Sequence, residues 1–200
     1  VFDRRFSLHT YIAFLNQAYH HVRHTVPLLM LAGGRLAVRQ FWLQEPIGEY
    51  IREESGHEQW ILNDIEGSGF SRQAFAEGQA PFDSDVLASF LCDTVQRRNP
   101  VGIFGMVLVL EGTSASLAPE VARIVQEELA LPDAAMTYLT SHGELDQDHI
   151  EYFETIMNRV SDESDQIDII RTANVVYRLY GDVFRAIPLE AEAIATEVAA

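Results

Sequence analysis

Residues 142–149 read HGELDQDH, and they place His142, Asp146 and His149 at positions i, i+4 and i+7. At about 100° per residue, an α-helix returns all three side chains to one narrow face. Imidazole and carboxylate groups in such a row are candidate ligands of a metal ion. The alternative is a solvated acidic face, since 30 of the 200 residues are Asp or Glu. The stretch therefore predicts a helix that carries three candidate metal ligands.

A second pair, Glu54 and His57, has the same spacing as Asp146 and His149. On a continuous helix, a carboxylate and a histidine three residues apart project from one face, so each pair can bind one ion. Several other acids surround Glu54 and His57, and a surface ion pair is the alternative there. Two such pairs predict two metal ions.

Glu111 stands apart from both pairs because it follows the apolar run Val101–Leu110. An unpaired buried carboxylate costs several kcal/mol, so Glu111 should be protonated, ion-paired or bound to a cation. The alternative is that the helix reaches the surface at Gly112. The six candidates together supply three carboxylates and three imidazoles, which resembles the inventory of carboxylate-rich di-iron or di-manganese sites in helix bundles.

Other reactive side chains carry weaker signals. Tyr19, His20 and His24 lie in a histidine-rich segment without a carboxylate at ligand spacing, which favours a pocket wall or a structural role. Cys92, the one cysteine, lies in an amphipathic segment and is interpreted as a small core residue rather than a nucleophile.

Helical periodicity dominates the sequence, and we expect a single helical-bundle domain over residues 1–200. Glu54 and His57 are expected on one helix that continues to about residue 65. Glu111 should end the most apolar helix, and Pro119 should begin the next. A capping box at Ser141 and Glu144 would place His142 in the first turn of a helix that ends near residue 160. The alanine-rich tail from residue 189 is compatible with a further helix.

Composition excludes several functions. A formal net charge of -16 would repel a phosphate backbone, so we expect no nucleic-acid partner. All 14 basic residues are arginine, which excludes lysine Schiff-base chemistry. The longest apolar run is about half of a membrane span. No signal peptide is evident at the start, and a single cysteine fits a reducing compartment. The expectation is a soluble cytoplasmic protein with no membrane partner.

The candidate ligands resemble those of the heme-oxygenase-like di-iron oxidase and oxygenase family, a group of iron-containing redox enzymes related to pyrroloquinoline quinone synthase and thiaminase II. The family pattern is Glu-x-x-His, then a lone Glu, then His-x3-Asp-x-x-His. The matching positions here are Glu54, His57, Glu111, His142, Asp146 and His149. The resemblance covers the chain from about Tyr19 to Val160. It implies an all-α fold, a compact heme-oxygenase-like bundle of about seven helices.

The resemblance also implies a function, a non-heme di-iron oxygenase or oxidase that activates dioxygen against a small organic acid, amine or amino acid. The cofactors would be two iron ions, with manganese or a mixed pair as alternatives. The partners would be the small-molecule substrate and dioxygen, with an electron donor and a homodimer as open alternatives. Two other functions stay open at this point. One is a metal-free binding protein of the same fold, and the other is a thiaminase II-like hydrolase or cofactorless oxidase. Heme binding by His20, His21 or His24 also stays open.

Overall fold

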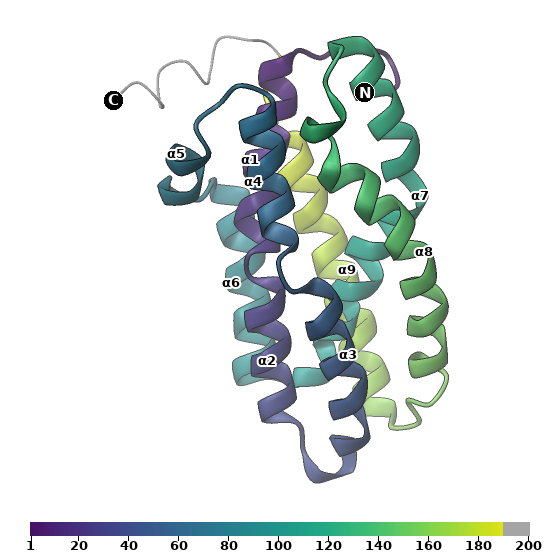
Figure 1. Cartoon of the computed structure of the whole chain (residues 1–200). Coiled ribbons are helices and arrows are strands. Elements are labelled where there is room, and N and C mark those ends of the chain that lie inside the picture. The colour runs from purple at the N-terminus through teal and green to yellow at the C-terminus, as the bar shows by residue number, and fades with distance from the viewer. Residues whose placement is uncertain (190–200) are drawn as a thin grey trace.

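Helices make up the structure in the part of the chain that it describes, and no strand occurs there (Figure 1). The computed structural model describes residues 1–189, except for the side chains of residues 142–148. The α-helices are α1 (Leu8–Val22), α2 (Thr25–Arg35), α3 (Gln44–Glu54), α4 (His57–Gly67), α5 (Arg72–Glu77), α6 (Phe82–Arg97), α7 (Ile103–Leu129), α8 (Thr137–Met157) and α9 (Glu163–Arg185). Short 3-10 helices occupy Val38–Leu43, Pro100–Gly102 and Asp133–Ala135. The all-α fold expected from the sequence is confirmed, and the tail expected beyond Leu189 lies outside the described residues.

Local sequence explains where the first and the last helix begin. The side chain of Ser7 accepts a hydrogen bond from the backbone N–H of Thr10 at the start of α1. Asp162 accepts hydrogen bonds from the N–H groups of Ser164 and Asp165 at the start of α9. Each cap satisfies backbone donors that have no partner within the helix, and so fixes the first turn.

The most apolar segment forms the central helix α7, which packs against α8 and α9. Gly105 lies where α7 meets α9, and a Cβ atom there would come within 2.5 Å of the carbonyl oxygen of Ile169. Glycine is therefore required for this close approach. Within the described chain, Pro100–Leu129 is the one segment long and apolar enough to cross a membrane, yet more than half of its most apolar window is buried inside the bundle. A core helix has this kind of burial.

Helix α7 continues through Pro119, so the predicted boundary between Glu111 and Pro119 is wrong. A proline inside a helix removes one backbone hydrogen bond and normally favours a break. The flanks of α7 pack along α8 and α9, and this tertiary packing outweighs the local cost. As a result Glu111 lies within a long helix, where it is 8% exposed.

Helix α8 begins at Thr137, one turn earlier than the predicted capping box at Ser141. Asp64 of α4 supplies the cap from across the bundle. Its carboxylate accepts hydrogen bonds from the N–H groups of Thr137 and Tyr138, each at 2.8 Å, and from the Thr137 hydroxyl at 2.6 Å. A cap from a distant helix leaves no local sequence signal, so the prediction of the start of α8 was wrong.

The helix that the sequence predicts across Glu54 and His57 is interrupted between these two residues. Glu54 is the last residue of α3 and His57 is the first residue of α4. Gly56 between them has a φ angle of 98°, a left-handed conformation that glycine adopts without a steric cost. The two members of this pair are therefore positioned by two different helices.

Two clusters of buried apolar side chains form the core. We call the first the Tyr50 cluster; it includes Leu29, Tyr50, Phe104, Phe153 and Val176. The second, the Tyr11 cluster, includes Tyr11, Leu15, Ile61, Val125 and Leu139.

Three buried polar residues lie where the chain passes from one cluster to the other. The Tyr50 cluster takes residues from α3, from the first part of α7 and from the end of α8. The Tyr11 cluster takes residues from α4, from the later part of α7 and from the start of α8. Glu54, Glu111 and His149 fall at these three transitions and are buried. The core therefore leaves one internal polar position between its two halves.

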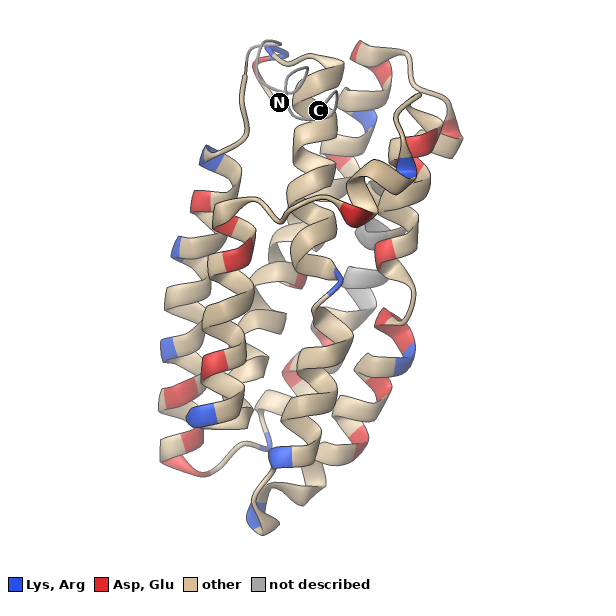
Figure 2. Cartoon of the chain, turned by 90° about the vertical axis from the view of Figure 1, so that its left-hand side faces the viewer, with Lys and Arg blue, Asp and Glu red and all other residues tan. Residues whose placement is uncertain are grey.

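Most charged residues in the described part of the chain are exposed or half-buried. On the side that Figure 2 shows, acidic positions run along the helices and arginine positions are interspersed among them. This distribution fits an acidic solvated surface, which favours solubility.

Candidate metal centre

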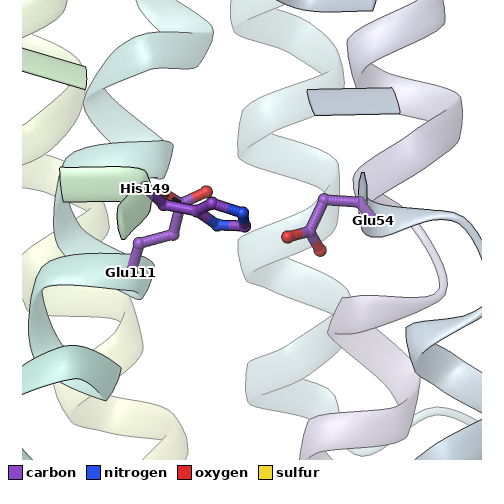
Figure 3. A group of neighbouring side chains, drawn as sticks. All are labelled: Glu54, Glu111 and His149. Carbon is purple, nitrogen blue, oxygen red and sulfur yellow. Dashed lines mark ion pairs between the residues drawn. The ribbon is translucent and has the colours of Figure 1, made fainter. Parts of the chain in front are cut away.

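Two carboxylates and one imidazole converge inside the bundle. Glu54 of α3, Glu111 of α7 and His149 of α8 each offer one ligand atom, and these atoms all lie within 4.8 Å of one another. Figure 3 shows the Glu54 carboxylate facing the His149 ring, with Glu111 beside that ring. The three residues are 7%, 8% and 4% exposed. Three helices that are distant in sequence thus contribute to one buried polar group.

The chemistry of this group fits a divalent transition metal. Carboxylate and imidazole ligands suit iron and manganese. Two carboxylates removed from water and close together are costly unless a cation or protons offset their charge. The chain has no lysine, and among the described residues the only arginine groups paired with carboxylates lie at partly or fully exposed positions elsewhere. His57 and His149 beside these carboxylates carry a positive charge only when they are protonated. A metal ion would supply positive charge with both imidazoles neutral.

His57 lies next to this group. Its Nδ1 atom is 3.2 Å from Oε2 of Glu54, and the side chain is buried. Its ring stacks on Trp60, with ring centroids 4.1 Å apart. The stacking fixes the ring plane of His57 beside the carboxylate of Glu54.

Glu53 is a functional candidate that the sequence reasoning missed. Its Oε2 atom lies 3.1 Å from Nε2 of His149, while Nδ1 of His149 lies 3.9 Å from Oε2 of Glu111. A proton on Nε2 that is donated to Glu53 leaves Nδ1 as the ring atom able to bind a metal. Carboxylates commonly orient metal-binding histidines in this way. The available signal was the doublet of glutamates in the last turn of α3.

Tyr50 is a second residue that the sequence reasoning missed. It lies one turn before Glu54 in α3, is fully buried, and has its ring centroid 6.0 Å from that of His149. Burial raises the pKa of the Tyr50 hydroxyl, and the nearby charge of Glu111 raises it further. The phenol therefore stays protonated near neutral pH.

His142 and Asp146 precede His149 in α8. Their side chains lie outside the described residues, so their predicted role as ligands stays a prediction.

A cavity of about 310 Å³ adjoins the metal-ligand group. Glu54, Glu111 and Tyr50 line it together with apolar side chains from α1, α7, α8 and α9. The group therefore has access to a space large enough for a small organic molecule.

The segment with His20, His21 and His24 contributes one histidine to the described lining of this cavity. His21 lines it, whereas Tyr19, His20 and His24 are absent from the described lining. A step of one residue turns a helical side chain by about 100°, so neighbouring histidines face different ways. The Nδ1 atom of His21 lies 2.9 Å from the carbonyl oxygen of Gln17, to which it donates when protonated.

His20 lies in an environment that opposes a positive charge. It is buried, and burial lowers its pKa to about 4, with further contributions from Arg23 and His24. Burial and Arg23 also lower the pKa of His24. These two histidines are therefore neutral near pH 7.

A buried carboxylate and imidazole centre in an all-helical bundle agrees with the family to which the sequence points. The model of a family described as iron-containing redox enzymes matches residues 12–181. The chain belongs to this family. No curated protein matches the chain.

Solved structures support the fold of this family member. A domain of unknown function with a heme oxygenase-like fold from Shewanella denitrificans has a TM-score of 0.81 at 20% identity, covering 90% of this chain and 78% of that one. A TenA homologue from Pseudomonas syringae has a TM-score of 0.73 at 12% identity, covering 90% and 79%. A TenA homologue from Pyrococcus furiosus has a TM-score of 0.64 at 12% identity, covering 88% and 82%. The heme-oxygenase-like fold expected from the sequence is confirmed.

Proposed function

We propose that this family member is a non-heme di-iron oxygenase or oxidase that activates dioxygen against a small organic substrate. The observation that carries the proposal is the convergence of Glu54, Glu111 and His149 at a buried position beside a cavity. Membership of a family described as iron-containing redox enzymes supports the same chemistry.

The described residues suffice to hold one ion, and the remaining candidates would complete a second site. Glu54, Glu111 and His149 would bind iron through two carboxylates and one imidazole. His57, next to Glu54, together with His142 and Asp146 on α8, would supply the other ligands. Bound iron supplies the electrons and the open coordination positions that dioxygen activation needs. A separate electron donor would return the irons to the reduced state.

The side chains around the centre have roles of their own. Glu53 holds the His149 ring through Nε2 and so orients its other nitrogen towards Glu111. The mainly apolar lining of the cavity would limit the access of water to a bound substrate. The substrate would lie in this cavity, next to Glu54 and Glu111.

An anaerobic iron titration followed by exposure to oxygen tests the proposal. About two ferrous ions per chain should bind, and oxygen should then produce a transient visible absorption band. The variant Glu111→Gln should bind less iron and give no band. Its matched control is Glu120→Gln, an exposed position on the same helix, which should behave as the parent. Iron binding that Glu111→Gln leaves undiminished would contradict the proposal.

A TenA-like activity is the second candidate, because two of the structural neighbours are TenA homologues. A thiaminase II-like reaction would need a cysteine nucleophile, and Cys92 is the one cysteine of the chain. Cys92 is exposed on α6, so its interpretation as a core residue is wrong, and it is absent from the described lining of the cavity. A hydrolytic activity that requires no iron and is lost in the variant Cys92→Ser would favour the thiaminase II-like reaction over the di-iron one.

A further inference from the structure

We propose that the cavity binds a mainly apolar molecule that carries no negative charge and has one hydrogen-bond acceptor, and that the hydroxyl of Tyr50 donates to this acceptor. The proposal rests on the proposed function only where it identifies this molecule as the substrate. Binding itself requires no iron, so it can be measured separately.

The shape and lining of the cavity favour an apolar molecule. Phe14, Leu110, Val121, Leu139 and Phe184 are among the side chains that surround it. Its volume of about 310 Å³ is close to the lower end of the range for small-molecule pockets, roughly 300–1,000 Å³. Burial of such a ligand against these side chains would supply most of the binding free energy.

The charges at the cavity disfavour an anionic ligand. No arginine side chain is found in the described lining, and the chain contains no lysine. The acidic lining residues are Glu54 and Glu111. A carboxylate ligand would lose its hydration without gaining an arginine or lysine partner, and in the metal-free chain it would meet two like charges. Amino acids and organic acids are therefore less favoured than neutral ketones, alcohols or ethers.

Tyr50 supplies a donor that is already fixed in place. The side chain lines the cavity, and its hydroxyl is buried with no hydrogen-bond partner among the described residues. The rings of Phe104, Tyr152 and His149 lie with centroids 6.4, 5.9 and 6.0 Å from the Tyr50 ring and hold it in position. A buried donor without a partner is costly, and an acceptor on the ligand would remove that cost.

Three probes of nearly equal size separate these requirements. Acetophenone is neutral and carries one acceptor, isopropylbenzene is neutral and carries none, and benzoate is anionic. Their affinities would be measured by titration calorimetry with the full-length chain without added metal. Acetophenone should bind most tightly, and benzoate should bind at least about tenfold more weakly because a buried unpaired charge is costly. Benzoate affinity equal to or greater than that of acetophenone would overturn the proposal.

The variant Tyr50→Phe tests the hydrogen bond. It should weaken acetophenone binding about threefold to tenfold, as expected for one neutral hydrogen bond, and leave isopropylbenzene binding unchanged. The matched control is Tyr177→Phe, which changes an exposed tyrosine of α9 and should alter neither affinity. An equal change for both probes, or no change for either, would rule out the assigned role of Tyr50.

The variant Ala118→Phe tests whether the probes occupy this cavity. Ala118 lines the cavity two turns beyond Glu111 on α7, so a larger side chain should displace both neutral probes without removing a metal ligand. Ser116→Phe, at an exposed position of the same helix, is the control that should retain binding. Ala118→Leu provides a smaller change if the phenylalanine variant melts at a much lower temperature. Undiminished probe binding in a folded Ala118 variant would place the ligand elsewhere.

Iron stoichiometry distinguishes failure of this proposal from failure of the proposed function. If the probe preferences hold but no iron binds, the di-iron function fails and the ligand class stands. If iron binds but benzoate is preferred in the metal-free chain, the ligand class fails and the di-iron function stands.

Discussion

The two carboxylate and histidine pairs share one spacing but have different backbones. Asp146 and His149 lie within the continuous helix α8. Glu54 and His57 lie on either side of a break, at the end of α3 and the start of α4. A left-handed Gly56 makes this break possible. Equal spacing in sequence therefore does not imply equal geometry, because the intervening backbone decides where each side chain points.

The break has a consequence for the site. The carboxylate of Glu54 joins Glu111 and His149, whereas His57 contacts Glu54 and stacks on Trp60. The last two turns of α3 also present Tyr50, Glu53 and Glu54 to one region. An uninterrupted helix would tie the direction of His57 to that of Glu54, whereas the break lets α4 set it independently.

The largest effect is expected from removing a ligand of the α8 pair. The variant His149→Ala should retain the fold but bind about one iron per chain, and it should form no oxygen-dependent absorption band, because loss of one imidazole releases one ion more readily than both. Iron analysis and stopped-flow spectroscopy would measure this.

His20 of α1 and His24 at the start of α2 provide the matched controls for this prediction. His20→Ala and His24→Ala should still bind two irons, since neither residue belongs to the described ligand group or lines the cavity. Undiminished iron in His149→Ala, or losses in the His20 and His24 variants instead, would move a heme or pocket role for these histidines ahead of the di-iron assignment.

The next effect concerns how the two pairs are held together. Asp64 of α4 caps α8 through Thr137 and Tyr138, so it joins the helix of one pair to the helix of the other. Asp64→Ala should lower the free energy of unfolding by about 3 kcal/mol, since it removes a cap and leaves buried donors without an acceptor. Asp64→Asn should cost about half as much, because one acceptor oxygen remains. Urea unfolding would measure both, and equal losses would show that the carbonyl oxygen does not replace the carboxylate.

A smaller effect tests the break itself. Gly56→Ala should cost about 1–2 kcal/mol because alanine is strained at a φ angle of 98°, and it should weaken iron binding by moving Glu54 relative to His57. The control is Gly48→Ala within α3, where an added Cβ meets nothing within 4 Å. That variant should stabilise the chain by about 0.5–1 kcal/mol. A stabilising Gly56→Ala would mean that the pair lies on a continuous helix after all.

The smallest effect is the contribution of His20, which lies outside the metal-ligand group, to the pH dependence of stability. Burial lowers the pKa of His20 to about 4, below its ordinary value of 6.5. Between these values the unfolded chain binds the proton more readily, so stability falls as the pH drops from 6.5 towards 4. Thermal melts should show a shallower acid-side decline in His20→Gln than in the parent, with the two curves parallel above pH 7. An unchanged acid-side slope would exclude His20 as a contributor.

The sequence predicted the helical class well because apolar residues recur at helical spacing and because helix caps such as Ser7 and Asp162 are local. It failed where tertiary contacts decide. Packing carries α7 through Pro119, and Asp64 starts α8 from another helix. Neither effect has a signature in the adjacent residues.

The candidate centre could be predicted only in part. Glu111 could be recognised because a carboxylate follows an apolar run, and the spacing of the pairs pointed to Glu54 and His149. Glu53 and Tyr50 could not be recognised, because their roles depend on how α3 packs against α8. The rotation of α1 about its axis decides which of its histidines lines the cavity. An error of one residue in the predicted helical phase turns each side chain by about 100°, so the sequence does not identify that histidine.

Anomalous diffraction from crystals loaded anaerobically with iron tests the central claim most directly. Data collected on both sides of the iron absorption edge locate each ion independently of the protein atoms. The account predicts an iron peak within about 2.0–2.3 Å of ligand atoms of Glu54, Glu111 and His149, with a second peak close by on the side of His57 or α8. Iron peaks at His20 or His24, with none among Glu54, Glu111 and His149, would contradict it.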